Sequence, residues 1–261
     1  DLKGALYTYS WDYLASLEGL ELKKYYYKLL SELGTASFNR ISEIYVKAVS
    51  SIDEPKNLQK IISEINKLDW YEAKEEGLGD LYEGLLAKNA DEKKSGAGQY
   101  FTPREIVKFI VDVLPIEHDS KVLDTSCGSG GFLLYALNKV RNKASELYPN
   151  YSKDVRQYDR WFKYWHDFAE KNLYGIEISE QISRAAKMNM IIHDDGHTNV
   201  ITSDGLVSDE TIITKTNNQG FKYGTFDFII TNPPFGSTVR QSEQAYLKTY
   251  QLGKKEEDWL A

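Results

Sequence analysis

The chain has 261 residues, of which 41% are hydrophobic, so it is long enough to bury a sizeable core and to form two domains. Its 39 acidic residues outnumber its 32 lysines and arginines, and the formal net charge is −7. A protein that grips duplex DNA unaided normally carries a basic surplus, so this balance argues against such a role. With no apolar run long enough for a membrane and no signal-peptide pattern, we expect a cytoplasmic protein without membrane contact.

The first part of the chain is predicted to be an all-helical domain over residues 1–90. Apolar residues recur at helical spacing in two segments, residues 22–33 and 58–68. Such stripes usually form a core, although part of this surface would also suit a partner subunit. The stretch ADEKKSGAG that follows is polar and contains glycine, so we assign residues 91–98 to a linker, either a plain connector or a hinge.

The sequence KVLDTSCGSGGFLLYAL at residues 121–137 predicts a short strand, a glycine turn and an amphipathic helix. Gly128, Gly130 and Gly131 allow the backbone to approach a ligand closely, and the N–H groups that open the helix are donors for a carboxylate or phosphate. The full G-x-G-x-x-G order of dinucleotide sites is absent. This segment therefore predicts a nucleotide-type cofactor site, with a dinucleotide disfavoured.

A second strand is predicted at residues 172–176, and it ends in Glu177, a carboxylate able to accept hydrogen bonds from both hydroxyls of a ribose. In dinucleotide sites this acid follows about 20 residues after the first strand. Here Glu177 follows much later, so an insertion must intervene. The charged, aromatic-rich segment 141–171 is this insertion, and we interpret it as a helix packed on the sheet in preference to a platform for stacking bases.

The apolar run FDFII at residues 226–230 predicts a buried strand, which the prolines of TNPPFG then end abruptly. Loops at the carboxyl ends of strands bind ligands in open α/β sheets. The side-chain oxygen of Asn232 and the carbonyl of Pro233 can accept both N–H bonds of an exocyclic amine, which directs the nitrogen lone pair outward. Phe235 can stack on a base that has left the duplex. The segment predicts methylation of an amino group, although a lone Asn-Pro-Pro is more often a rigid turn.

Metal binding is not expected. Cys127 is the single cysteine, and its place within the glycine turn indicates a small packing residue. His193 and His197 are four residues apart, but the intervening Asp-Asp-Gly predicts the end of a helix that runs over residues 181–192.

Six segments occur in the order found in methylation subunits of type I restriction-modification systems, and the chain resembles this family from about Glu76 to Gly236. The segments are GQYFTPREIV (98–107), DTSCGSGGF (124–132), GIEIS (175–179), AAKMNMIIHDDGH (185–197), SDGL (203–206) and FDFIITNPPFG (226–236). The resemblance implies an adenine-N6 DNA methyltransferase that uses S-adenosylmethionine. It also implies double-stranded DNA, a specificity subunit and a restriction subunit as partners.

The resemblance implies roles for particular positions. The segment that closes over S-adenosylmethionine would be Gln99, Tyr100, Phe101, Thr102, Pro103 and Arg104. Ser129, Gly130 and Gly131 would contact the cofactor from the glycine turn, Asp124 would orient that turn or meet the methionyl end, Glu177 would hold the ribose, and Asp204 would lie near the cofactor's adenine. Asn232, Pro233, Pro234 and Phe235 would form the catalytic loop. Thr125 and Ser126 depart from the proline or alanine usual in the family.

The implied fold is an α/β, Rossmann-like methyltransferase domain over residues 99–261, after the helical domain. No apolar β run follows Gly236, so we expect the sheet to lack strands that the family's seven-stranded sheet contains, and the C-terminal part of the domain to be missing. Two alternatives stay open at this point. One is a methyltransferase that acts on ribosomal RNA or on protein glutamine. The other is a non-catalytic module that binds the cofactor and a partner.

Overall fold

The computed structural model describes residues 10–35, 42, 44–67, 102–193 and 199–234. The chain divides into two compact units, residues 1–78 and 79–261, and each unit is described by itself. The boundaries expected at residue 90 and at the linker 91–98 lie outside the described residues. Those domain boundaries therefore stay predictions.

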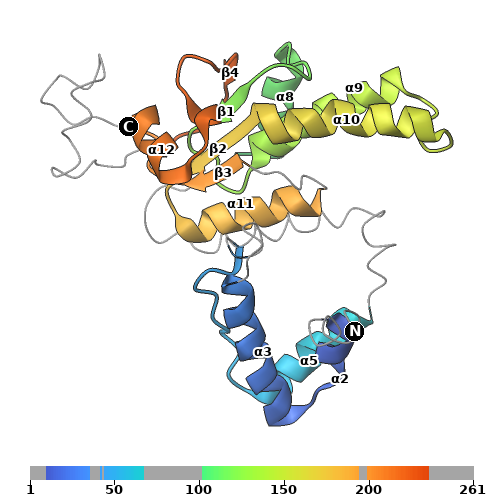
Figure 1. Cartoon of the computed structure of the whole chain (residues 1–261), viewed down its shortest axis with the longest axis vertical. Helices are drawn as coiled ribbons and strands as arrows, with labels where there is room; N and C mark the ends of the chain where they lie inside the picture. The colour runs from blue at the N-terminus through green and yellow to red at the C-terminus, as the bar shows by residue number, and fades with distance from the viewer. Residues whose placement is uncertain (1–9, 36–41, 43, 68–101, 194–198, 235–261) are drawn as a thin grey trace, which may run out of the picture. The chain divides into compact units, whose positions relative to one another are not determined.

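In the described part of the first unit, three helices pack around a small core. They are α2 (Trp11–Ser16), α3 (Gly19–Gly34) and α5 (Pro55–Asn66), shown in blue and cyan in Figure 1. Leu14, Leu22, Leu58 and Ile62 form the buried core, so both predicted helical stripes are confirmed. The stripe on α5 is narrower than its apolar residues suggested, because Ile61 is 43% exposed.

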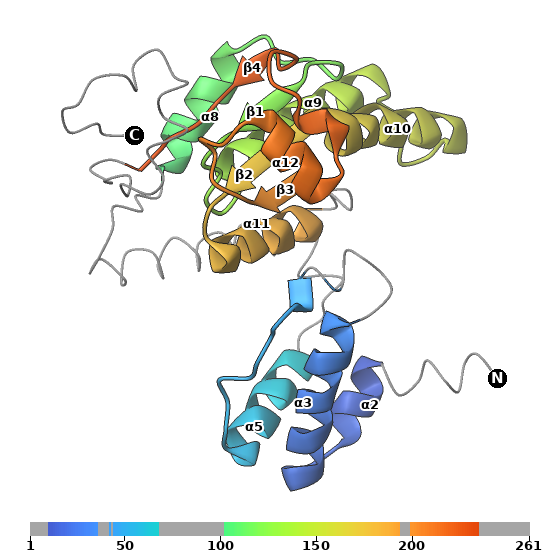
Figure 2. The same ribbon diagram turned by 60° about the vertical axis from the view of Figure 1, so that its left-hand side comes forward.

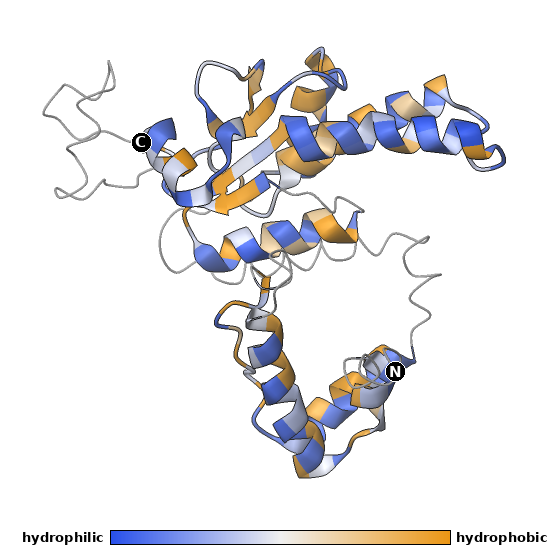
Figure 3. Cartoon of the chain, viewed as in Figure 1, coloured by the Kyte–Doolittle hydropathy of each residue, from blue (hydrophilic) through white to orange (hydrophobic). Residues whose placement is uncertain are grey.

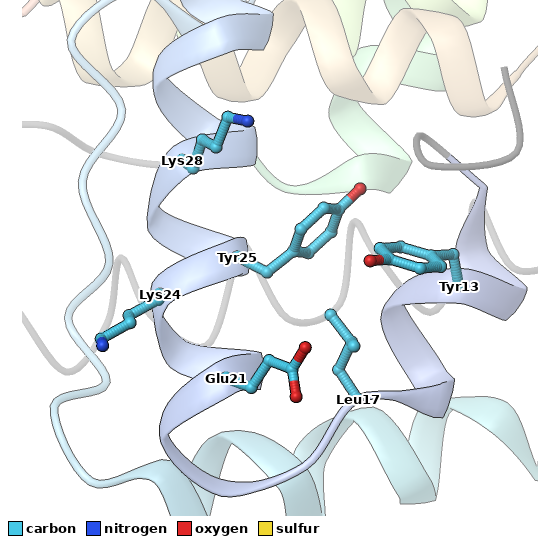
Figure 4. Close-up of a pocket in the computed structure, with 6 residues that line it drawn as sticks. All are labelled: Tyr13, Leu17, Glu21, Lys24, Tyr25 and Lys28. Carbon is cyan, nitrogen blue, oxygen red and sulfur yellow. The ribbon is translucent and has the colours of Figure 1, made fainter. Parts of the chain in front are cut away.

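A hollow of about 340 Å³ opens between α2 and α3. Figure 4 shows its lining residues, which are Tyr13, Leu17, Glu21, Lys24, Tyr25 and Lys28. The rings of Tyr13 and Tyr25 meet edge to face with centroids 5.0 Å apart. None of the residues that the sequence assigns to a cofactor or to catalysis lines this hollow, so it is no part of the predicted site.

The second unit alternates helices with parallel strands. Its elements are α8 (Arg104–Val113), β1 (Val122–Asp124), α9 (Gly131–Leu147), α10 (Val155–Asn172), β2 (Leu173–Glu177), α11 (Glu180–Ile192), β3 (Asn199–Thr202), α12 (Asp209–Thr216), the 3₁₀ turn η1 (Gln219–Phe221) and β4 (Phe228–Ile229). The described strands form one sheet in the order β3-β2-β1-β4, and every pair is parallel. The predicted α/β class is confirmed.

The two central strands, β1 and β2, are buried at every residue, as parallel strands between helices should be, whereas β3 and β4 are partly exposed, with Ile229 63% exposed. Val122 and Leu173 pack into a core formed largely with α8, α9, α10 and α11, whereas Leu123 and Tyr174 point to the other face, towards α12 and η1. Figure 2 shows α9 and α12 on opposite sides of the strands. The helices alternate hydrophilic and hydrophobic stretches along their length in Figure 3, because each buries only one stripe.

The insertion between β1 and β2 consists of the long antiparallel helices α9 and α10. Asp154 caps α10 by accepting hydrogen bonds from the backbone N–H groups of Arg156 and Gln157. Trp165 and Phe168 are 2% and 0% exposed, and both belong to the core that also holds β1. The interpretation of this segment as a helix packed on the sheet is confirmed.

The predicted strand at residues 226–230 is shorter in the structure, where β4 comprises Phe228 and Ile229 alone. The backbone N–H groups of Asp227 and Phe228 both donate to the Lys121 carbonyl, so regular pairing starts only at Phe228, opposite Val122. The N–H of Ile230 then donates to Leu123, and the prolines that follow shortly afterwards end the strand.

No helix among the described residues is long and apolar enough to cross a bilayer.

Gly175 sits where β2 meets α9, and the close packing there makes a test of the fold. A Cβ at this position would lie 2.7 Å from Leu133 Cδ1 and 3.1 Å from Cys127 Sγ. We expect Gly175→Ala to lower the free energy of unfolding by about 1–3 kcal/mol, as overpacking does, in a denaturant titration. Gly131→Ala is the matched control, since its Cβ would meet no atom within 4 Å. Equal stability of the two variants would contradict this packing.

Candidate functional site

The predicted site residues converge where the sheet reverses its order. From β1 the chain builds outward through β2 to β3, and then crosses back to place β4 on the other side of β1. Crevices at such switch points, beyond the carboxyl ends of the strands, bind ligands in open α/β sheets. The segments that leave β1 and β4 there are the glycine turn after Asp124 and the loop that contains Asn232. Parallel pairing of Val122 with Phe228 brings these segments together.

The glycine turn is a compact loop that only glycine allows. Gly128 and Gly130 have φ angles of +54° and +88°, in the left-handed region that other residues rarely adopt. The backbone N–H of Gly130 donates to Cys127 at 2.8 Å, and that of Cys127 donates to Ile176 on β2 at 2.9 Å. A Cβ at Gly128 would meet no atom within 4 Å, so open space borders the turn.

Glu177 ties the end of β2 to this turn. One carboxylate oxygen accepts the backbone N–H of Gly128 at 3.0 Å, and the other accepts the N–H of Ser179 at 2.8 Å. The side chain is largely buried, with the residue 7% exposed. Each carboxylate oxygen has a second lone pair, so the group can hold the turn and still accept hydrogen bonds from a ligand.

Asp124, the last residue of β1, is a buried carboxyl group 1% exposed to solvent. Burial raises its pKa from 3.8 to about 7, although hydrogen bonds from the Ser126 backbone and the Thr231 side chain oppose the rise, and the nearby charge of Glu177 adds to it. The Ser126 N–H donates to Asp124 at 3.0 Å. Near neutral pH this carboxyl group is poised between its neutral and charged forms.

The catalytic loop predicted at residues 232–235 is described as far as Pro234. Asn232 is half-buried, and its side-chain amide nitrogen donates to the hydroxyl oxygen of Thr102 at 2.9 Å. Just before it, the Thr231 hydroxyl lies 3.3 Å from that of Thr125 in the glycine turn. The predicted residues Gln99, Tyr100, Phe101 and Phe235 lie outside the described residues.

Asp204 lies on the loop that follows β3, next to the glycine turn. Its side chain accepts the backbone N–H of Leu206 at 2.9 Å. The adjacent Gly205 packs so closely that a Cβ there would lie 2.4 Å from the Thr125 carbonyl oxygen. The Ser203 N–H donates to the carbonyl of Glu177, which continues the pairing of β3 with β2 beyond the strand end.

Two further candidate residues, Pro103 and Arg104, begin α8. Pro103 is the N-cap residue, and its carbonyl accepts the N–H groups of Ile106 and Val107. Val107 and Val111 on the same helix are buried against the core that contains α9. The start of α8 is thereby held near the Asn232 loop through Thr102.

Several residues that shape the site gave no recognisable signal in the sequence. Thr231 hydrogen-bonds the Asp124 carboxyl group. Asn189 on α11 is 0% exposed, and its amide nitrogen donates to the Ser129 carbonyl at 3.1 Å. Threonine and asparagine are common polar residues, and only the folded chain brings these to the glycine turn.

Cys127 behaves as a packing residue. Burial raises the pKa of its thiol well above the usual value, so the nucleophilic thiolate is disfavoured. Within the described part of the chain, His166, Asp167 and Glu170 on α10 have potential ligand atoms within 4.8 Å of one another. This group is partly or fully exposed and lies on the insertion helix, so we assign it no metal.

The class of protein follows from this geometry. A switch point in a parallel sheet, a glycine turn after β1 and an acid at the end of β2 define a Rossmann-like α/β domain. A solved structure from Listeria monocytogenes, described as a class I S-adenosylmethionine-dependent methyltransferase, shares this fold. The TM-score is 0.52 at 12% identity, over 90% of this chain and 65% of that one.

The family is defined more closely by sequence. The N-6 DNA methylase family model matches residues 73–259, and the chain belongs to this family. It is 33% identical over 236 residues to the methylase subunit of the type I restriction enzyme StySPI from Salmonella potsdam, a match that covers 88% of this chain and 42% of that subunit. A structure of a type I restriction-modification system has a TM-score of 0.64 at 21% identity, over 90% of this chain and 45% of that one. The chain thus spans about two fifths of the curated relative's length.

The buried Asp124 gives the protein a pH dependence with a definite sign. Because the folded-state pKa of about 7 exceeds the unfolded value of 3.8, the folded state holds the proton more tightly between these pH values. Stability from this group is fully present below about pH 4 and is lost as the pH rises to about 7. We expect the melting temperature of Asp124→Asn relative to wild type to rise across that window.

Thermal unfolding in a series of buffers measures this difference. Asp159→Asn is the matched control, since it removes the same charge at an exposed position on α10. A pH profile of Asp124→Asn that parallels the wild type would show that Asp124 does not titrate in this range.

Proposed function

We propose that this chain carries the cofactor-binding and catalytic part of an adenine-N6 DNA methyltransferase, the methylation subunit of a type I restriction-modification system. Membership in the N-6 DNA methylase family supports the reaction. The likeness to a type I methylase subunit over 88% of the chain supports the setting.

The observation that carries the proposal is the position of Asn232. It leaves β4 at the switch point, 2.9 Å from Thr102, and the preceding residue contacts the glycine turn. An amine-orienting group is therefore placed beside a nucleotide-type cofactor site, which is what direct transfer between the two requires. If the Asn-Pro-Pro segment served only to end a core strand, its position beside a nucleotide-type cofactor site would have no function.

The residues around the glycine turn suit S-adenosylmethionine. Left-handed glycines beside open space let the cofactor's methionyl part approach the backbone. The carboxylate of Glu177 has lone pairs for the ribose hydroxyls. Asp124 is a buried acid, and the positive groups of the cofactor would favour its charged form. Asp204 follows β3 and lies beside the turn, where the adenine would lie. Thr102, Pro103 and Arg104, with Gln99, Tyr100 and Phe101, would close over the cofactor.

The bound cofactor supplies a methyl group that its sulfonium already activates, so the protein needs no strong base. The side-chain oxygen of Asn232 and the carbonyl of Pro233 accept the two N–H bonds of the adenine amine and turn its lone pair towards the methyl carbon. When bound, the cofactor would supply the methyl group to the amine with its sulfur as the leaving group, and the amine's extra proton would pass to water. Phe235 stacks on the flipped base, and Pro234 stiffens the loop.

The proposed partners explain the charge of the chain. A net charge of −7 is poorly suited to gripping double-stranded DNA alone. In the proposed complex, a specificity subunit reads the sequence and holds the duplex, and a restriction subunit joins the same assembly. The complex acts in the cytoplasm, where the DNA is.

The first test is Asn232→Ala in the full-length gene with its neighbouring genes. We expect N6-methyladenine to disappear from a two-part sequence motif, because the amine would no longer be oriented. Sequencing that detects modified bases, applied to DNA from cells with wild type or variant, measures this. Asn57→Ala, at an exposed position on α5, is the matched control. Identical methylation maps for wild type and Asn232→Ala would rule out the proposed role of Asn232 and disfavour DNA as the substrate.

Glu177→Ala tests the cofactor site separately from the transfer step. Loss of charge-assisted hydrogen bonds to the ribose should weaken S-adenosylmethionine binding by about tenfold or more. Isothermal titration calorimetry on the full-length protein measures the affinity, and Asn232→Ala should bind the cofactor nearly as well as wild type. Glu180→Ala removes an equal charge from a nearby exposed position and serves as the control. Unchanged affinity in Glu177→Ala would exclude the ribose role.

A further inference from the structure

We infer that Thr102 is a positioning residue for the transfer step, because its hydroxyl holds the side-chain amide of Asn232 by its nitrogen, with the amide oxygen directed away from this contact. This inference rests on the proposed function of the site. The two side chains are 130 positions apart in the chain and meet at 2.9 Å, with the amide nitrogen as donor and the hydroxyl oxygen as acceptor. The role is distinct from the contact with the cofactor that the resemblance implies for the segment around Thr102.

The orientation of the amide decides whether the site works. Asn232 can help to orient an amine only with its oxygen, since its nitrogen is a donor and would repel the amine's N–H bonds. An amide has two orientations of nearly equal shape, so packing alone discriminates poorly between them. A hydrogen bond from Nδ2 to Thr102 occupies the nitrogen side and leaves Oδ1 free for the substrate. The hydrogen bond therefore holds the amide in the productive arrangement before the base arrives.

The hydroxyl is well placed to do this because its support is rigid. Thr102 precedes Pro103, the N-cap of α8, and Pro103 has a fixed φ angle. The other end of α8 is held by Lys139 of α9, whose ammonium group donates to the carbonyls of Val111 and Asp112 at 2.9 and 3.0 Å. Because α9 begins at the glycine turn, a continuous series of contacts through α9 and α8 connects that turn to Thr102 and Asn232. The same contacts therefore position both the residues proposed to bind the cofactor and the residue proposed to bind the amine.

The contact also has an alternative explanation, that it merely stabilises the loop. The two explanations differ in what they predict for a serine at position 102, which keeps the hydroxyl and lacks the methyl group. They also differ in whether kcat changes while the Kd for the cofactor does not. Valine has the shape of threonine without the hydroxyl, whereas serine keeps the hydroxyl. Thr102→Val and Thr102→Ser therefore separate hydrogen bonding from packing.

The experiment uses the full-length methylation subunit with its specificity subunit and a duplex that carries the target motif. We expect Thr102→Val to lower kcat by about ten- to a hundredfold, in line with the effect of misplacing a reacting group, while the Kd for S-adenosylmethionine stays within about threefold. Thr102→Ser should recover at least about a third of the wild-type rate. Thr225→Val, whose hydroxyl bonds the Lys222 carbonyl ahead of β4, is the matched control and should leave the rate unchanged.

A double-mutant comparison tests the contact itself. If Thr102 acts through Asn232, then the melting-temperature shifts of Thr102→Val and Asn232→Ala should be non-additive in the double variant. An unchanged kcat in Thr102→Val, or a weakened cofactor Kd as the whole effect, would overturn the inference. So would a Thr102→Ser variant as slow as Thr102→Val.

Failure of the proposed function gives a different result. If the wild-type complex methylates no DNA, the proposed substrate is wrong whatever the variants do. The contact is then judged by the melting temperatures of Thr102→Val, Asn232→Ala and the double variant, since side chains in contact give non-additive shifts. Additive shifts would show that the two side chains do not interact and would overturn the inference for any substrate.

Discussion

The hydrogen bond from the Gly128 N–H to the Glu177 carboxylate is the contact on which the site depends. It joins the turn after β1 to the end of β2. The glycine turn and the Glu177 carboxylate, which is proposed to bind the ribose, therefore lie side by side. Parallel pairing of Val122 with Leu173 makes it possible, because both strands then end at the same edge. The proposed cofactor site is therefore built on strand ends, and the loops complete it.

Burial of two carboxyl groups at this edge of the sheet is electrostatically unfavourable. Asp124 and Glu177 are both nearly inaccessible to water, and their proximity adds to the effect of burial on the pKa of Asp124. Stabilising two carboxyl groups here without a ligand requires backbone and threonine hydrogen bonds, which the Ser126 N–H and Thr231 supply. A ligand with positive charge would relieve the same strain. The pair of buried acids thus suits the cationic cofactor proposed for this site.

Much of the second unit could be predicted from sequence because its signals are local. The run around Asp124 has the apolar strand, the glycines and the helical stripe in immediate succession, and the structure confirms each of them. The strand before Asn232 was predicted too long, since apolar character extends further than regular pairing with β1. The contacts of Thr102, Thr231 and Asn189 could not be predicted, because a single polar residue carries no periodicity and its partner lies far away in the chain.

The sequence by itself determined the α/β class of the domain, the strands that precede the glycine turn, Glu177 and Asn232, and the residue types of the predicted site. These properties follow from local hydrophobic period, from glycine's access to positive φ, and from proline's inability to continue a strand. Only the tertiary structure decided which polar groups meet: the Glu177 carboxylate with the glycine turn, and the Asn232 amide with Thr102. Such pairings depend on the order of parallel strands and on helix packing, which bring together residues 49 and 130 positions apart and leave no trace in any one segment.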